Sequence, residues 1–207
     1  MSKLYLVGIG PGSGKYLTKE AVDVVNSSEI VIGSKRALNL FPDMGAEKIE
    51  LNAQNMGEML KLAVSKAAEG NMVALLSTGD PGFSGLLKSI QKIKGNLSVE
   101  VVPGISSIQL CAAELQIPWD EANIITMHGK GFSSRLLPLL SNGRPTIILP
   151  NTTIKETVNY LIEKGIDPKR ASAVCENLSY ENEKVVKTSL EELLGEKFGY
   201  MCVLVVY

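Results

Sequence analysis

The chain has 207 residues, 45% of them apolar and 21% charged, which is enough to bury the core of one large or two small domains. The net charge of −1 lacks the basic excess that nucleic-acid binding requires, so we expect no nucleic-acid partner. No apolar run reaches roughly 18 residues and the strand-like N-terminus carries no signal-peptide pattern, so we expect no membrane span and a cytoplasmic protein.

Cysteine and histidine usage limits the disulfide and metal chemistry. Cys111, Cys175 and Cys202 lie far apart in the sequence and are odd in number, so we interpret them as buried thiols in a reducing compartment. His128 is the only histidine, which excludes a His-rich cluster. We therefore predict no metal site.

The first half of the chain alternates between strand and helix patterns. Short apolar runs predict strands, and apolar residues at helical spacing predict amphipathic helices. This alternation favours a mostly parallel sheet with helices on both faces. The expected strands cover residues 4–9, 29–32, 73–76 and 99–102, and three of the expected helices cover 35–40, 56–69 and 85–94. Two further helices are expected to begin after a cap, one at Thr18 and one at Ser106 or Ser107.

The segment 116–120 interrupts this alternation, and we place a domain boundary there. Residues 1–116 are expected to form an N-terminal α/β domain and residues 117–207 a C-terminal α/β domain. The strand–helix–strand ending of the second half predicts antiparallel edges, and therefore a mixed sheet. The expected strands cover 123–127, 146–149, 171–175, 184–187 and 201–206, with helices at 135–140, 153–164 and 190–194.

Three glycine-containing loops follow strands of the first half, at residues 8–12, 79–85 and 103–107. In open α/β sheets, ligands bind beyond the carboxyl ends of the strands, where these loops are expected. The same residue types also make plain turns and helix caps. Taken singly, each loop leaves both interpretations open.

Two familiar nucleotide-binding motifs fail in the first loop. The dinucleotide pattern requires a glycine where Ser13 stands, and an acidic residue after the second strand, which ends instead at 32–33. The P-loop pattern fits at Gly14-Lys15 but has Ile9 and Tyr16 at its other key positions. NAD and nucleoside triphosphates are therefore disfavoured as ligands.

Taken together, the three loops carry a specific order of motifs. The succession Gly-x-Gly-Pro-Gly, Gly-Asp-Pro-x-x-x-Gly and Pro-Gly-Ile-Ser-Ser resembles that of the tetrapyrrole methylase family, and the resemblance covers the whole chain. It implies two α/β domains with S-adenosylmethionine in the cleft between them, and methyl transfer to a tetrapyrrole carbon. Segments 103–120, 127–131 and 175–180 are most similar to the members that methylate C-5 of cobalt-precorrin-7 in cobalamin biosynthesis.

The resemblance also implies site residues by motif position. Lys130, where the family often has Arg, and Arg135 are the expected contacts for substrate carboxylates. We assign no general base, because a nucleophilic carbon and a sulfonium leaving group mainly require alignment. The implied cofactor contacts are Pro11, Gly79, Asp80, Phe83, Ser106, Ser107, Met127, His128 and Glu176.

The family also suggests partners. Its members are usually homodimers, so a homodimer is expected. Bifunctional relatives carry a second domain that methylates C-15 and removes a carboxyl group; here we expect that activity in a separate protein, which is a candidate partner. Two alternatives stay open: the same fold acting on another tetrapyrrole position or another substrate, and a non-enzymatic nucleotide-binding module.

Overall fold

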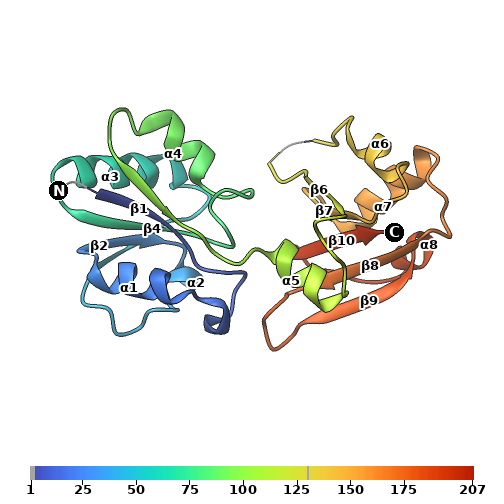
Figure 1. Ribbon diagram of the computed structural model, residues 1–207, viewed down its shortest axis with the longest axis horizontal. Coiled ribbons are helices and arrows are strands. Elements are labelled where there is room, and N and C mark those ends of the chain that lie inside the picture. The colour runs from blue at the N-terminus through green and yellow to red at the C-terminus, as the bar shows by residue number, and fades with distance from the viewer. Residues whose placement is uncertain (1–2, 130) are drawn as a thin grey trace. The chain divides into compact units, whose positions relative to one another are not determined.

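The computed structural model describes residues 3–129 and 131–207, and the chain divides into two compact units, Met1–Ser106 and Ser107–Tyr207. Each unit contains one five-stranded sheet (Figure 1). Helix α5 (Ser107–Glu114) begins the second unit because it contacts strand β10 (Cys202–Val206) of that unit. The division therefore lies before the boundary expected after Gln116.

The sheet of the first unit is parallel throughout, with the strand order β3-β2-β4-β1-β5, which confirms the expected sheet. Sequence reasoning missed the edge strand β3, because its sequence Glu-Lys-Ile-Glu is charged and mostly exposed. The strands are β1 (Lys3–Gly8), β2 (Ile30–Gly33), β3 (Glu47–Glu50), β4 (Met72–Ser77) and β5 (Val99–Val102).

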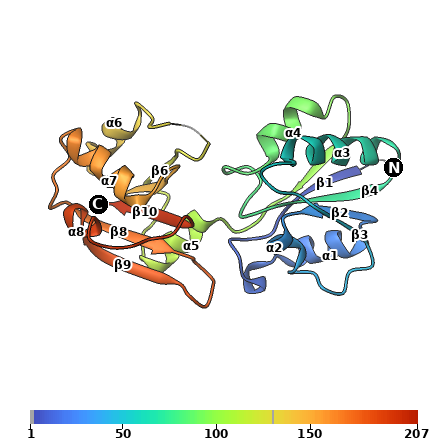
Figure 2. The same ribbon diagram turned by 180° about the vertical axis from the view of Figure 1, so that it is seen from behind.

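Helices cover both faces of this sheet, as both ribbon views show (Figures 1 and 2). Successive side chains of a strand point to opposite faces, so Leu6 packs in the core cluster of α3 and α4 while Val7 packs in that of α1 and α2. A single 3-10 turn, η1 (Gly14–Tyr16), follows the first loop. The helices are α1 (Lys19–Ser27), α2 (Lys35–Leu38), α3 (Met56–Ala68) and α4 (Leu87–Ile93).

The sheet of the second unit is mixed, as expected, with the order β6-β7-β10-β8-β9. Strands β6 and β7 are parallel, and the other neighbours are antiparallel. The last strand, β10, lies in the middle of the sheet and not at the predicted edge; all of its residues are buried, which suits its unbroken apolar run. The other strands are β6 (Asn123–Thr126), β7 (Thr146–Leu149), β8 (Ala171–Glu176) and β9 (Lys184–Ser189).

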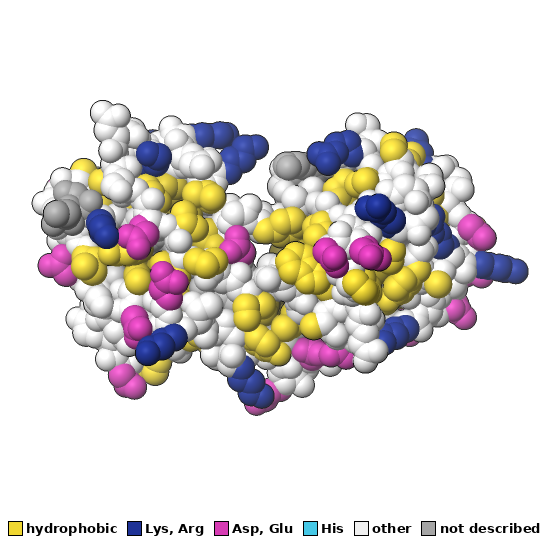
Figure 3. All heavy atoms as spheres, viewed as in Figure 1, with side chains coloured by type: hydrophobic (Ala, Val, Ile, Leu, Met, Phe, Trp, Pro, Cys, Tyr) yellow, Lys and Arg dark blue, Asp and Glu magenta, His cyan; other side chains and the backbone are white. Residues whose placement is uncertain are grey.

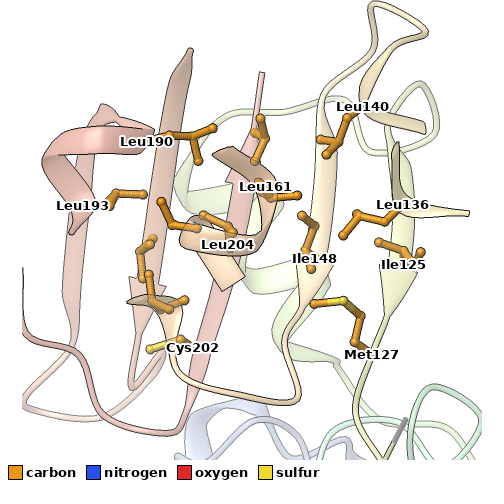
Figure 4. Close-up of a cluster of buried hydrophobic side chains, with 14 residues drawn as sticks. Ile125, Met127, Leu136, Leu140, Ile148, Leu161, Leu190, Leu193, Cys202 and Leu204 are labelled. Carbon is orange, nitrogen blue, oxygen red and sulfur yellow. The ribbon is translucent and has the colours of Figure 1, made fainter. Parts of the chain in front are cut away.

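Three helices form the main core of the second unit against one face of this sheet (Figure 4). They are α6 (Leu136–Leu140), α7 (Ile154–Glu163) and α8 (Leu190–Leu193). Leu136, Leu161 and Leu204 meet there with no more than 1% of their surfaces exposed. The ends of the strands packed in this core carry His128, Asn151 and Glu176.

All three cysteines are buried and free, as the sequence predicted. Cys111 of α5 contacts Cys175 of β8, with 3.4 Å between the two sulfur atoms. The hydrogen bond to Cys175 and burial raise the pKa of the Cys111 thiol well above its ordinary value. Among the described residues, no helix has the length and apolar character needed to cross a membrane.

Candidate functional site

The first and second loops of the first unit are hydrogen-bonded to each other. They follow β1 and β4, which are neighbours in the parallel sheet, so both loops leave the same edge. The Gly79 N–H donates to the Gly10 carbonyl at 2.8 Å, and the Ile9 N–H donates to the Ser77 carbonyl at 3.0 Å. Pro11, which follows this contact, is buried.

The third loop packs on the other two through glycines. A Cβ atom at Gly104 would lie 2.3 Å from the Gly79 carbonyl oxygen, and one at Gly8 would lie 2.5 Å from the Gly104 nitrogen. Neither distance is compatible with a side chain. The three motifs therefore meet as bare backbone, and only glycine permits the approach.

Asp80 ties this arrangement together with both oxygens of its carboxylate. Its Oδ1 accepts from the Gly82 N–H at 2.8 Å, within its own turn, and its Oδ2 accepts from the Gly104 N–H at 3.2 Å. Asp80 therefore orders the second and third loops, a role that sequence reasoning did not assign. Because each carboxylate oxygen can accept more than one hydrogen bond, Asp80 retains acceptor capacity for a ligand.

In the second unit, the ends of several strands meet at one edge of the sheet. Strands β6, β7 and β8 run in the same direction, because β7 and β8 are both antiparallel to β10. Their carboxyl ends therefore lie at the edge where β10 begins. His128 follows β6, Asn151 follows β7, Glu176 ends β8 and Tyr200 precedes β10.

His128 is held at this edge from several sides. Its backbone N–H donates to Thr126 Oγ1 at 3.2 Å, and the next N–H, of Gly129, donates to Asn151 Oδ1 at 2.9 Å. Gly129 has φ +69°, a conformation that favours glycine. The Tyr200 hydroxyl lies 3.3 Å from His128 Nδ1, and the two rings meet edge to face.

Glu176 anchors the segment that precedes β10. Its Oε1 accepts from the Gly199 N–H at 2.5 Å. Glu176 pairs with Cys202 in the sheet, and burial followed by the Glu176 charge raises the pKa of the Cys202 thiol to about 12. The edge thus presents a carboxylate and an imidazole beside a thiol that stays protonated at neutral pH.

A family model for tetrapyrrole (corrin/porphyrin) methylases matches residues 3–194. The chain belongs to this family. A probable cobalt-precorrin-7 C(5)-methyltransferase from Methanocaldococcus jannaschii is 45% identical to it over 204 residues, which cover 98% of this chain and 96% of the relative.

Solved structures place this tetrapyrrole methylase in the same fold. A precorrin-6Y methylase of cobalamin biosynthesis from Archaeoglobus fulgidus has a TM-score of 0.78 and 25% identity, covering 100% of this chain and 98% of that one. A uroporphyrin-III C-methyltransferase from Thermus thermophilus, solved with S-adenosylhomocysteine, has a TM-score of 0.78 and 23% identity, covering 99% and 91%. The expected family and fold are confirmed.

The structure of this methylase groups some of the expected site residues and leaves others apart. Gly79 and Asp80 lie against the first and third loops, and His128 and Glu176 share the edge of the second sheet. The Met127 side chain is 1% exposed and packs in the core of its unit (Figure 4), so only its backbone is available at that edge.

The remaining expected contacts take different positions. Ser106 ends the first unit and is buried, whereas Ser107 begins α5; Phe83 is half-buried in the second loop. Lys130 lies outside the described residues. Arg135 is exposed at the start of α6, and its backbone N–H donates to Ser133 Oγ. On the face shown in Figure 3, acidic and basic side chains occur on both units.

Sequence reasoning missed Asn151 and Tyr200. Tyr200 contacts a histidine 72 positions earlier in the chain, and the segment before β10 carries no motif that marks this contact. The sequence carries only a weak signal for Asn151: this residue follows a buried strand, and ligands bind beyond the carboxyl ends of strands in open α/β sheets. A second aromatic contact was also missed: Phe132, in the loop after β6, stacks on Tyr160 of α7 with 3.8 Å between ring centroids.

Proposed function

We propose that the protein transfers a methyl group from S-adenosylmethionine to C-5 of cobalt-precorrin-7, a step of cobalamin biosynthesis. The observation that carries this proposal is the 45% identity, over 98% of the chain, to a relative named for that reaction. The fold shared with a precorrin-6Y methylase supports it. We further propose a cytoplasmic homodimer that works with a separate C-15 enzyme.

The donors and acceptors of the chain suit the proposed cofactor, which supplies an electrophilic methyl group on a sulfonium. The spare acceptor capacity of Asp80 suits an ammonium or hydroxyl group, and the hydroxyls of Ser106 and Ser107 suit a carboxylate. At the second edge, Glu176 and His128 suit the hydroxyls and ring nitrogens of adenosine. Pro11, Gly79, Phe83 and the Met127 backbone complete the proposed contacts.

In this proposal the residues act by binding and orientation. Correct alignment of the reacting atoms supplies roughly 7–11 kcal/mol without proton transfer. Three loops joined by glycine contacts and by Asp80 are well suited to it, because their geometry is set before a ligand arrives. Lys130 and Arg135 are proposed to bind the carboxylates of the tetrapyrrole.

A labelling experiment tests the reaction. The protein is incubated with ¹³C-methyl S-adenosylmethionine and cobalt-precorrin-7, and the product is mapped by NMR. We expect the label at C-5. Label at another carbon would show that the protein methylates a different position of the tetrapyrrole by the same chemistry. Binding of ATP or NAD in preference to S-adenosylmethionine would favour a nucleotide-binding module.

A titration tests Asp80. In Asp80→Ala, the N–H groups of Gly82 and Gly104 lose their acceptor, and an unsatisfied polar group costs about 1–3 kcal/mol. We expect calorimetry to show S-adenosylhomocysteine binding at least about tenfold weaker. Asp23→Ala, on the exposed surface of α1, is the matched control and should bind like the unaltered protein. Unchanged affinity in Asp80→Ala would remove Asp80 from the cofactor site.

A further inference from the structure

Tyr200 combines high exposure with a fixed position. Tyr200 is 71% exposed, compared with 47% for Trp119 and 39% for Tyr207. The residue before it is nevertheless anchored twice: the Gly199 N–H donates to Glu176 Oε1 at 2.5 Å, and the Gly199 carbonyl accepts from the Cys202 thiol at 3.4 Å. The tyrosine is therefore presented at the edge of the second sheet by a short, tethered segment.

The hydroxyl of this tyrosine lies 3.3 Å from Nδ1 of His128. The backbone of His128 is already fixed by Thr126 and, through Gly129, by Asn151. The contact with Tyr200 adds control of the ring itself. A neutral imidazole has one protonated nitrogen and one acceptor nitrogen, so a donor at Nδ1 places the proton on Nε2.

We propose that Tyr200 is a positioning residue, whose hydroxyl donates to His128 Nδ1 and holds the imidazole as the Nε2–H tautomer in one orientation. The exposed Nε2–H then serves as a hydrogen-bond donor to an acceptor atom of a bound adenosine, either a purine nitrogen or a ribose oxygen. This proposal rests on the proposed function, because it takes His128 as a cofactor contact. A tyrosine hydroxyl can donate a hydrogen bond as well as accept one, and in this proposal it is the donor.

The first test observes the tautomer directly. His128 is the only histidine, so ¹⁵N-histidine labelling gives one pair of ring-nitrogen signals without assignment. At a pH where the ring is neutral, we expect the shifts of an Nε2–H tautomer, and in Tyr200→Phe a move toward a mixture of both tautomers. Tyr207→Phe, at the opposite end of β10, should change neither signal. An Nδ1–H tautomer in the unaltered protein, or unchanged shifts in Tyr200→Phe, would overturn the proposal.

The second test asks whether the tautomer matters for binding. Calorimetric titration with S-adenosylhomocysteine compares the unaltered protein, Tyr200→Phe, His128→Ala and the double variant. We expect affinity to fall about threefold to tenfold in Tyr200→Phe and at least as much in His128→Ala. The double variant should lose no more than His128→Ala alone, because the hydroxyl acts only through the imidazole. Additive losses would show that Tyr200 acts independently and would overturn the proposal.

The two tests separate this proposal from the proposed function. If the unaltered protein fails to bind S-adenosylhomocysteine, the proposed function and adenosine as the ligand are both rejected, while the nitrogen shifts still decide whether Tyr200 sets the tautomer. The Phe variant keeps the aromatic ring, so we expect its thermal unfolding to match that of the unaltered protein. If it does not, the tautomer is measured in Asn151→Ala as well, which removes the acceptor of the Gly129 N–H but leaves the Tyr200 hydroxyl in place. Retention of the Nε2–H tautomer in that variant is expected, and a mixture of both tautomers would overturn the proposal.

Discussion

The two units position their loops by different means. In the first unit, backbone meets backbone: a Cβ atom at Gly8 or Gly104 would collide with the Gly79 carbonyl oxygen, and the Asp80 carboxylate adds one side-chain hydrogen bond between these loops. In the second unit, side chains accept hydrogen bonds from loops that are distant in sequence: Glu176 accepts from the Gly199 N–H, and Asn151 accepts from the Gly129 N–H. A contact that needs glycine restricts the sequence to one residue, whereas a contact that needs only an acceptor can be made by several residue types.

The largest expected effect comes from adding one methyl group to the first unit. Gly104→Ala places a Cβ atom 2.3 Å from the Gly79 carbonyl oxygen, and the loops must separate to admit it. Such overpacking costs typically 1–3 kcal/mol, so we expect the free energy of unfolding to fall by about 3 kcal/mol. Urea denaturation monitored by circular dichroism measures the change.

Gly45→Ala is the matched control, because nothing lies within 4 Å of its added Cβ atom. Its free energy of unfolding should stay within about 0.5 kcal/mol of that of the unaltered protein. If Gly104→Ala and Gly45→Ala prove equally stable, the backbone contact does not constrain the first unit, and the contrast with the second unit disappears.

A smaller effect is expected when a side-chain anchor of the second unit is changed. Glu176→Ala removes the acceptor of the Gly199 N–H and should cost about 1–2 kcal/mol, whereas Glu176→Gln keeps an amide oxygen there and should cost less than half of that. Hydrogen exchange at the Gly199 amide measures the anchor itself. Equal acceleration of exchange in both variants would mean that the charge, and not the acceptor, holds this segment.

This contrast also explains what the sequence could predict. The parallel sheet and the buried cysteines were predicted correctly, because burial leaves few residue types that fit, whereas the cofactor-binding role of the glycine loops stays a prediction. Strand β3 was missed because a charged edge strand buries too little apolar surface to show a pattern. Strand β10 was recognised as a strand, but its central position depends on pairing with β7 and β8, which periodicity does not encode.

In the candidate site, too, local features were visible in the sequence and long-range contacts were not. Gly79 and Asp80 stood out in the sequence because their neighbours are turn residues at the end of a buried strand. The second role of Asp80, accepting from Gly104, joins residues far apart in the chain and became visible only in the folded protein. Tyr200 carried no signal at all, because its partner is a histidine from a different strand end.

The smallest expected effect concerns a helix cap outside the site. The carboxylate of Glu192 in α8 accepts hydrogen bonds from Thr188 and from the side chain and N–H of Ser189, and these lower its pKa to about 2. Because the pKa of Glu192 is lower in the folded state than its ordinary value of about 4.5, the ionised carboxylate stabilises the fold at pH values above about 4.5. This contribution to stability is lost as the pH falls toward 2.

Glu192→Gln should therefore flatten the fall in stability between about pH 4.5 and pH 2, measured by thermal unfolding across that range. Glu191→Gln, on the same helix, should retain the fall. Because Glu192 is exposed, the change at neutral pH should be small, and S-adenosylhomocysteine affinity should stay the same. A loss of affinity would mean that the cap of α8 supports the segment carrying Tyr200, and that the second unit positions its loops through more than the local anchors at Glu176 and His128.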